Sequence, residues 1–247
     1  MTALSALTER VIVNTYRDLD LVFAVVTPLA TFVGFMLALG KVIDTGGLSY
    51  PQYLLPITVI QATVFSSMTT ADRAARDQSQ GFGVRMQSLP IAAAIPLTAR
   101  MLYCLLRGAL GLIAAFVVAY VFGFRLNGGA WYAVAFVALF MTFTLALSLA
   151  ADAVGTRLNH IEAASQILFI PQMLLVLLST GLAPVNAFPE WLRPFVTHQP
   201  VSQITETLRH FTEGRVEAGN LAATMAWCVG MLVVFGMAAL RMQRRPG

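Results

Sequence analysis

The sequence predicts an all-α polytopic membrane protein with six transmembrane helices. Hydrophobic residues make up 57% of its 247 residues and charged residues only 11%, against about 25% charged in an ordinary soluble domain. The mean hydropathy is +0.73. Six apolar runs also reach the length of about 20 residues that a helix needs to cross a bilayer. This composition disfavours a soluble enzyme, a disordered chain and a disulfide-bonded secreted domain.

The six runs share high hydropathy and a near absence of charge, with Arg107 as the one charged residue inside them. They cover residues 21–40, 51–71, 101–124, 128–151, 163–183 and 218–240. We expect Arg107 to snorkel to the nearer interface, and Asp152, just beyond the fourth run, to be solvated. Cys104 and Cys228 lie inside apolar runs, which indicates buried thiols rather than a disulfide or a metal site.

The distribution of basic residues predicts the orientation. Ten Lys and Arg lie on the side of both termini, five lie on the opposite side, and Arg107 completes the total of sixteen. Basic residues gather on the cytoplasmic side of membrane proteins. We therefore expect a multi-pass protein of the plasma (inner) membrane with both termini in the cytoplasm. Topology, and not nucleic-acid binding, explains the positive net charge.

Three segments outside the runs have a character of their own. Residues 1–20 place Leu4, Leu7 and Val11 on one helical face, which favours an interfacial helix over a solvated tail. Residues 72–100 form the longest connection on the terminal side and combine Arg, Gln and apolar residues, as a docking surface does. The alternative for this segment is an idle connector.

The third segment, residues 184–217 on the opposite side, is too apolar for a plain external loop. Pro200 at a first helical position and Gly214 beyond the last turn predict a helix between them. Its apolar face would carry Val201, Ile204, Leu208 and Phe211. We expect short re-entrant helices here that dip into the outer leaflet and are covered by protein.

Catalytic motifs are absent from the sequence. It contains no HExxH, no GxSxG, no pair of intramembrane acids and no P-loop with Ser or Thr after its Lys. We therefore expect no enzyme activity, cofactor or metal on this chain, and if ATP drives it, another chain must bind the nucleotide. Polar residues at helical spacing within the spans either hydrogen-bond neighbouring helices or line a substrate path. They are Thr63, Ser66, Ser67, Thr70, Gln172 and Ser179.

Two segments resemble permeases of type-2 ABC exporters, in particular the daunorubicin-resistance group. They are STGLAPVNAFPEWLRPFVTHQPVSQITETLRHF, which ends at Phe211, and GFGVRMQSLPIAAAIPLTAR, which ends at Arg100. The segments YLLPITVIQATVFSSM, FGFR and SLAADAVGT are similar to the mycobacterial DrrB type within this group. The resemblance covers nearly the whole chain as a single transmembrane domain, residues 1–247.

The resemblance implies half of a transporter. A P-loop ATPase subunit (DrrA-like) would hold ATP and Mg, and a second six-span permease (DrrC-like) would complete a heterodimer, with a homodimer as the second choice. The implied function is the ATP-driven outward movement of large amphipathic molecules, such as phthiocerol dimycocerosates or anthracyclines. The alternative is a non-transporting membrane scaffold or assembly subunit of a lipid biosynthesis complex.

The resemblance also implies roles for two groups of residues. The coupling segment within residues 72–100 would dock on the ATPase, and the aromatic cluster after the fifth span would form an outer gate. The coupling residues are Arg76, Gly81, Phe82, Gly83, Arg85, Met86, Leu89 and Pro90. The gate residues are Phe188, Pro189, Trp191, Leu192 and Phe195.

Overall fold

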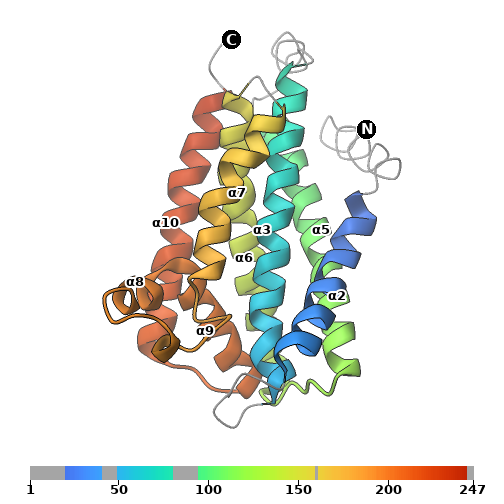
Figure 1. Ribbon diagram of the computed structural model, residues 1–247. Helices are drawn as coiled ribbons and strands as arrows, with labels where there is room; N and C mark the ends of the chain where they lie inside the picture. The colour runs from blue at the N-terminus through green and yellow to red at the C-terminus, as the bar shows by residue number, and fades with distance from the viewer. Residues whose placement is uncertain (1–19, 41–48, 80–93, 159–160, 244–247) are drawn as a thin grey trace.

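A computed structural model describes residues 20–40, 49–79, 94–158 and 161–243, and every regular element in these ranges is a helix (Figure 1). The predicted interfacial helix over residues 1–20 falls almost wholly outside the described ranges. The elements, labelled as in Figure 1, are α2 (Asp20–Leu39), α3 (Tyr50–Ser79), α5 (Ala94–Val121), α6 (Gly129–Arg157), α7 (Ile161–Leu177), the 3-10 helix η1 (Val185–Ala187), α8 (Arg193–His198), α9 (Pro200–Glu213) and α10 (Ala218–Gln243).

Five of these helices are long and apolar enough to cross a membrane: α2, α3, α5, α6 and α10. They run side by side, so that α2 begins and α10 ends at one end of the bundle (Figure 1). We call this the ion-pair end, after the pairs of Arg73 and Arg100 described below. The opposite end holds α8 and α9 and is called the α9 end.

The fifth predicted span, residues 163–183, differs from expectation. Its helix α7 has 17 residues and ends at Leu177, which corresponds to about 26 Å against a hydrocarbon core of about 30 Å. The chain leaves the helix because the backbone that follows bonds to other elements. Thr180 donates its backbone N–H to Ser202 Oγ, and Tyr53 donates its hydroxyl to the Thr180 carbonyl. The six-span count is therefore not confirmed within the described ranges.

The predicted connections at the ion-pair end are shorter than expected. Helix α3 continues through residues 72–79, α5 already begins at Ala94, and α6 continues through residues 152–157. Each extension contains charged residues, among them Arg73, Arg100 and Asp152, at which the apolar runs of the sequence end. A helix needs no apolar surroundings to continue, because its backbone hydrogen bonds are satisfied internally.

The core follows the long helices and includes α9. Fully buried aromatic side chains come from α2, from the connection between α5 and α6, and from α6. Among them are Phe32, Phe124 and Phe136. The predicted apolar face of α9 packs into the same cluster: Val201, Ile204, Leu208 and Phe211 are all buried. Pro200 is the first residue of α9, and Gly214 ends it in the left-handed conformation with φ of 76°. The helix predicted between Pro200 and Gly214 is thus confirmed.

Helices α3 and α6 approach each other closely at Gly155. A Cβ atom added to this glycine would lie 2.2 Å from the carbonyl oxygen of Ala71. Because that contact is with backbone, relief requires the two helices to separate. Gly230 in α10 has no atom within 4 Å of the same position.

We predict that Gly155→Ala lowers the thermal unfolding midpoint of the purified protein in detergent, with a loss of about 1–3 kcal/mol from overpacking. The matched control is Gly230→Ala, which places the same methyl group in open space. It should be neutral or slightly stabilising, because alanine favours helix over glycine. Equal midpoints for the two variants would contradict the close approach of α3 and α6.

Candidate transport site and the contacts that frame it

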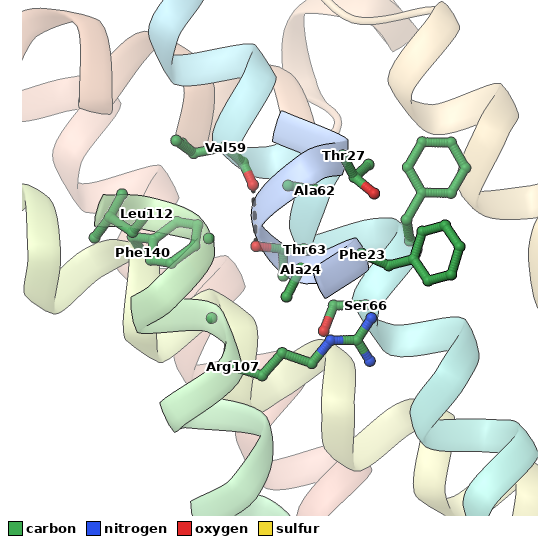
Figure 2. A pocket seen from close by; sticks show the side chains of 13 residues that line it. Phe23, Ala24, Thr27, Val59, Ala62, Thr63, Ser66, Arg107, Leu112 and Phe140 are labelled. Atoms are coloured by element: carbon green, nitrogen blue, oxygen red, sulfur yellow. Dashed lines mark hydrogen bonds between the residues drawn. The ribbon is translucent and has the colours of Figure 1, made fainter. Parts of the chain in front are cut away.

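A pocket opens between α2, α3 and α5, with one side chain from α6 (Figure 2). Helix α3 supplies its polar side with Thr63 and Ser66, and α5 supplies Arg107. The other walls are apolar or made of small residues, apart from the hydroxyl of Thr27 on α2. They are Phe23, Ala24, Thr27, Val59, Ala62, Phe65, Gly108, Gly111, Leu112 and Phe140. The cavity volume is about 30 Å³, room for about two water molecules.

Arg107 lies inside the bundle and does not snorkel to an interface as expected. The residue is only 6% exposed, and its side chain extends from α5 toward Ser66 of α3 (Figure 2). Its Nη1 donates to Thr69 Oγ1. Among the described residues, its Nε has no hydrogen-bond partner and no carboxylate lies within ion-pair distance of the guanidinium. The pocket therefore contains a buried positive charge with hydrogen-bonding capacity to spare.

The predicted polar residues of the substrate path divide into two groups. Thr63 and Ser66 line the pocket with Arg107. Thr63 also lies 3.4 Å from Thr144 of α6, oxygen to oxygen, and Thr70 lies 3.2 Å from the sulfur of Cys104.

The second group joins α3 to α7. Ser67 and Gln172 hydrogen-bond through two contacts of 2.9 and 3.1 Å, away from the pocket lining. Ser179 is fully buried just after α7, and its hydroxyl has no hydrogen-bond partner in the described part of the chain. The six predicted residues therefore do not form one continuous path. Thr63 and Ser66 are the members that reach the cavity.

Two groups of ion pairs hold the helices together at the ion-pair end. Arg100 of α5 lies 2.7 Å (Nε–Oδ1) from Asp152 of α6 and 3.4 Å from Asp77 of α3. Asp152 is 0% exposed, so the expectation that it is solvated is wrong. Helix α6 continues past it, and this keeps the carboxylate between the helices. Arg73 of α3 lies 2.6 Å from Asp20 of α2 and stacks over the Tyr103 ring at 4.6 Å.

Side chains of α3 and α9 satisfy the irregular backbone at the α9 end. Besides the bonds of Thr180 to Tyr53 and Ser202, Gln199 Nε2 donates to the Leu178 carbonyl at 2.5 Å. Arg209 of α9 lies over the ring of Tyr53 at 3.9 Å. Such a stacked cation and ring attract each other more strongly where water is excluded. These contacts fix α9 against α3 and against the end of α7.

His210 faces the turn between α9 and α10. Burial lowers the pKa of its imidazole below the ordinary value, and the nearby Arg215 guanidinium lowers that pKa further. The carboxylates of Glu213, Glu217 and Glu206 oppose the shift, and Glu217 lies 3.9 Å away. The folded protein therefore favours neutral His210.

The predicted gate residues lie around η1 and α8 and do not form a buried cluster. Trp191 is 78% exposed and Phe195 is 49% exposed. Phe188 and Leu192 are half-buried, and Pro189 is exposed. An outward-facing aromatic surface of this kind suits a lipid interface.

Of the predicted coupling residues, only Arg76 is described. It is exposed on the last turns of α3. The others fall outside the described ranges: Gly81, Phe82, Gly83, Arg85, Met86, Leu89 and Pro90. The sequence analysis singled out Arg107 only as a residue expected to snorkel, and it did not single out Tyr53 and Arg209, because their helices α3 and α9 are distant in sequence. A lone arginine in an apolar run was the one signal that pointed to Arg107.

Comparison with known proteins places this arrangement in a family. A profile of the ABC-2 type transporter family matches residues 2–211. The chain is 36% identical over 202 residues to the doxorubicin resistance ABC transporter permease protein DrrB of Mycobacterium tuberculosis, covering 79% of this chain and 70% of that protein. It is 25% identical over 233 residues to the probable permease DrrC of that organism, covering 92% and 83%. The daunorubicin resistance permease DrrB1 of Streptomyces coeruleorubidus is 23% identical over 225 residues, covering 91% and 80%.

We predict that Arg100→Gln destabilises the protein by about 3–5 kcal/mol, because it leaves the buried Asp152 carboxylate without its partner. The measurement is thermal unfolding in detergent, and adding Asp152→Asn to the variant should recover part of the loss. Arg193→Gln is the matched control, since its partner Glu190 is 90% exposed and such surface pairs contribute about 0–1 kcal/mol. Similar losses for the two arginine variants would refute the structural role of the buried pair.

We predict that acidification destabilises the α9 end through His210. As the pH falls through about 6.5, the unfolded histidine takes up a proton that the folded protein resists, so stability is lost toward acid pH. The fall in the unfolding midpoint between pH of about 7.5 and about 5.5 should be smaller in His210→Gln than in the wild type. His198→Gln, at an exposed histidine of α8, should keep the wild-type fall. An unchanged fall in His210→Gln would sink this assignment.

Proposed function

The chain belongs to the ABC-2 type transporter family, and on that premise we propose that it is the transmembrane permease subunit of an ATP-driven exporter. The exporter moves large amphipathic molecules outward across the plasma membrane, and a separate subunit hydrolyses the ATP. The observation that carries this proposal is the 36% identity to a permease whose name records doxorubicin resistance, over 79% of the chain. The membership also favours a permease over the scaffold or assembly subunit that the sequence left open.

The proposed partners follow from the absence of a P-loop in the sequence and from the similarity of the chain to two permeases. Its sequence has no P-loop, so ATP and Mg belong to a DrrA-like ATPase subunit. The chain is similar to both a DrrB and a DrrC of one organism, which supports a heterodimer with a second permease of this family. We place both termini and the coupling segment in the cytoplasm, on the side richer in arginine.

The proposed mechanism starts at the ion-pair end. Closure of the ATPase subunits displaces the coupling segment around Gly81–Pro90, which joins α3 to α5. The ion pairs of Arg100 with Asp152 and of Arg73 with Asp20 transmit this displacement to α6 and α2. The bundle then rearranges, and the segment from Phe188 to Phe195 opens at the outer face. Such coupling requires that the partner contacts differ between the two states.

The substrate class is a large amphipathic molecule with few charges. The described cavity is small, and its lining is largely apolar with three hydroxyl groups and one arginine. Complex envelope lipids such as phthiocerol dimycocerosates and hydrophobic antibiotics such as anthracyclines both belong to this class. The relatives named for doxorubicin and daunorubicin resistance support the antibiotic.

We predict that the chain, expressed with its neighbouring genes and purified in mild detergent, co-elutes with a P-loop ATPase and a second permease. Inverted membrane vesicles that hold this complex should accumulate doxorubicin only when ATP is present. Replacing Phe82 and Arg85 by Ala should preserve ATP hydrolysis and abolish accumulation, because the coupling contacts are lost.

The control is Thr98→Ala, an exposed position at the same end of the bundle, which should transport normally. Elution of the chain alone, without a nucleotide-binding partner, would refute the exporter and favour the scaffold. Transport that survives the Phe82 and Arg85 double substitution would refute the coupling assignment alone.

A further inference from the structure

We propose that the pocket between α2, α3 and α5 binds the phosphate group of an anionic membrane lipid through Arg107. This inference deepens the proposed function by naming a ligand class, and it rests on that function only in placing these helices in a bilayer. It arises from an arginine that the fold buries with no carboxylate within ion-pair distance among the described residues.

The charge of the site selects an anion. Arg107 is 6% exposed, and among the described residues its guanidinium donates to the neutral Thr69 hydroxyl while its Nε has no acceptor. The other buried or half-buried arginines at the ion-pair end behave differently, because Arg73 and Arg100 each face a carboxylate. A buried charge without a counter-ion is costly. A bound oxyanion would offset this penalty, and arginine matches phosphate oxygens with two parallel N–H donors.

The polar side of the pocket supplies further donors. Ser66 lies beside the Arg107 guanidinium (Figure 2), and no hydrogen bond joins its hydroxyl to the described part of the chain. Thr27 of α2 adds a second hydroxyl to the lining. Thr63 is engaged differently, since its hydroxyl donates to the Val59 carbonyl. Arg107, Ser66 and Thr27 thus surround the space from three helices.

The shape of the site favours a lipid over a free ion. The cavity of about 30 Å³ has room for headgroup oxygens but not for a whole amphiphile. Phe23 belongs to the lining and is 56% exposed, and Val22 and Val26 beside it on α2 are also exposed. An acyl chain can therefore lie along α2 in the bilayer while one or two phosphate oxygens enter the pocket and reach Arg107. A cationic ligand would meet the charge of Arg107 and be repelled.

The test is native mass spectrometry of the full-length purified permease titrated with dioleoyl phosphatidylglycerol. We expect Arg107→Gln to weaken binding about tenfold or more, as the loss of a charged hydrogen bond does. Lipid binding by Arg107→Lys should be weakened less, because lysine keeps the positive charge but lacks the planar guanidinium with its two parallel N–H donors. Arg125→Gln, an exposed arginine after α5 that contacts Tyr120 and not the pocket, should bind as the wild type does.

A second variant separates binding from folding. Ala62→Leu fills the pocket from α3 while Arg107 stays in place, and it should show the same loss of lipid with an unchanged elution profile. Dioleoylglycerol, which has the same acyl chains without the phosphate, should not compete. Equal binding of the two lipids, or wild-type binding by both Arg107→Gln and Ala62→Leu, would overturn the proposal.

Inorganic phosphate distinguishes the source of the oxyanion. We expect millimolar phosphate to leave the lipid bound, because it lacks the apolar contribution of the acyl chains. Full displacement by phosphate would assign the site to a free ion and overturn the lipid. The titration needs no ATPase, so its failure leaves the exporter standing, and a failure to recover an ATPase partner leaves the lipid site standing.

Discussion

Polar groups inside a helical bundle in a membrane need partners within the protein, because lipid offers them none, and the structure is organised by this constraint. At one end Arg100 neutralises the fully buried Asp152. At the other end Tyr53 and Gln199 donate hydrogen bonds to the backbone carbonyls that follow α7. Between them, Ser67 and Gln172 pair across two helices. Arg107 departs from this pattern, because among the described residues it has no carboxylate within ion-pair distance and its Nε has no hydrogen-bond partner. An ionisable group of this kind inside a membrane protein points to a ligand.

Helix α3 is the element through which these contacts are joined. It packs against α2, α5, α6, α7 and α9, and it carries Tyr53 near one end and Arg73 near the other. Its 30 residues correspond to about 45 Å, longer than the hydrocarbon core. In the proposed exporter this geometry gives a rigid connection from the coupling segment to the α9 end, with the Arg107 pocket beside its middle.

Local signals were sufficient to predict some elements, whereas others depended on contacts between distant segments. Pro200, Gly214 and the apolar positions between them specify α9 without any tertiary information. Hydropathy located five spans but placed the ends of α3 and α6 too early, because polar residues such as Arg73 and Asp152 continue a helix when a neighbouring helix neutralises them. Hydropathy also overestimated the length of α7. The sequence remains apolar after Leu177, although the backbone there leaves the helix and hydrogen-bonds to Tyr53 and Ser202. The burial of Arg107 depends on Phe23 and Ser66, which lie 84 and 41 positions earlier in the chain.

The two cysteines have a practical consequence for following motion in this protein. Cys104 is 4% exposed and Cys228 is 1% exposed, both are free thiols, and the chain contains no others. Bulky maleimide labels therefore have little access to the native sulfurs. A cysteine introduced at an exposed position such as Trp191 would be the dominant reactive site in an otherwise unaltered protein. Because the native thiols are buried, the segment from Phe188 to Phe195 can be labelled at a single site for spectroscopy.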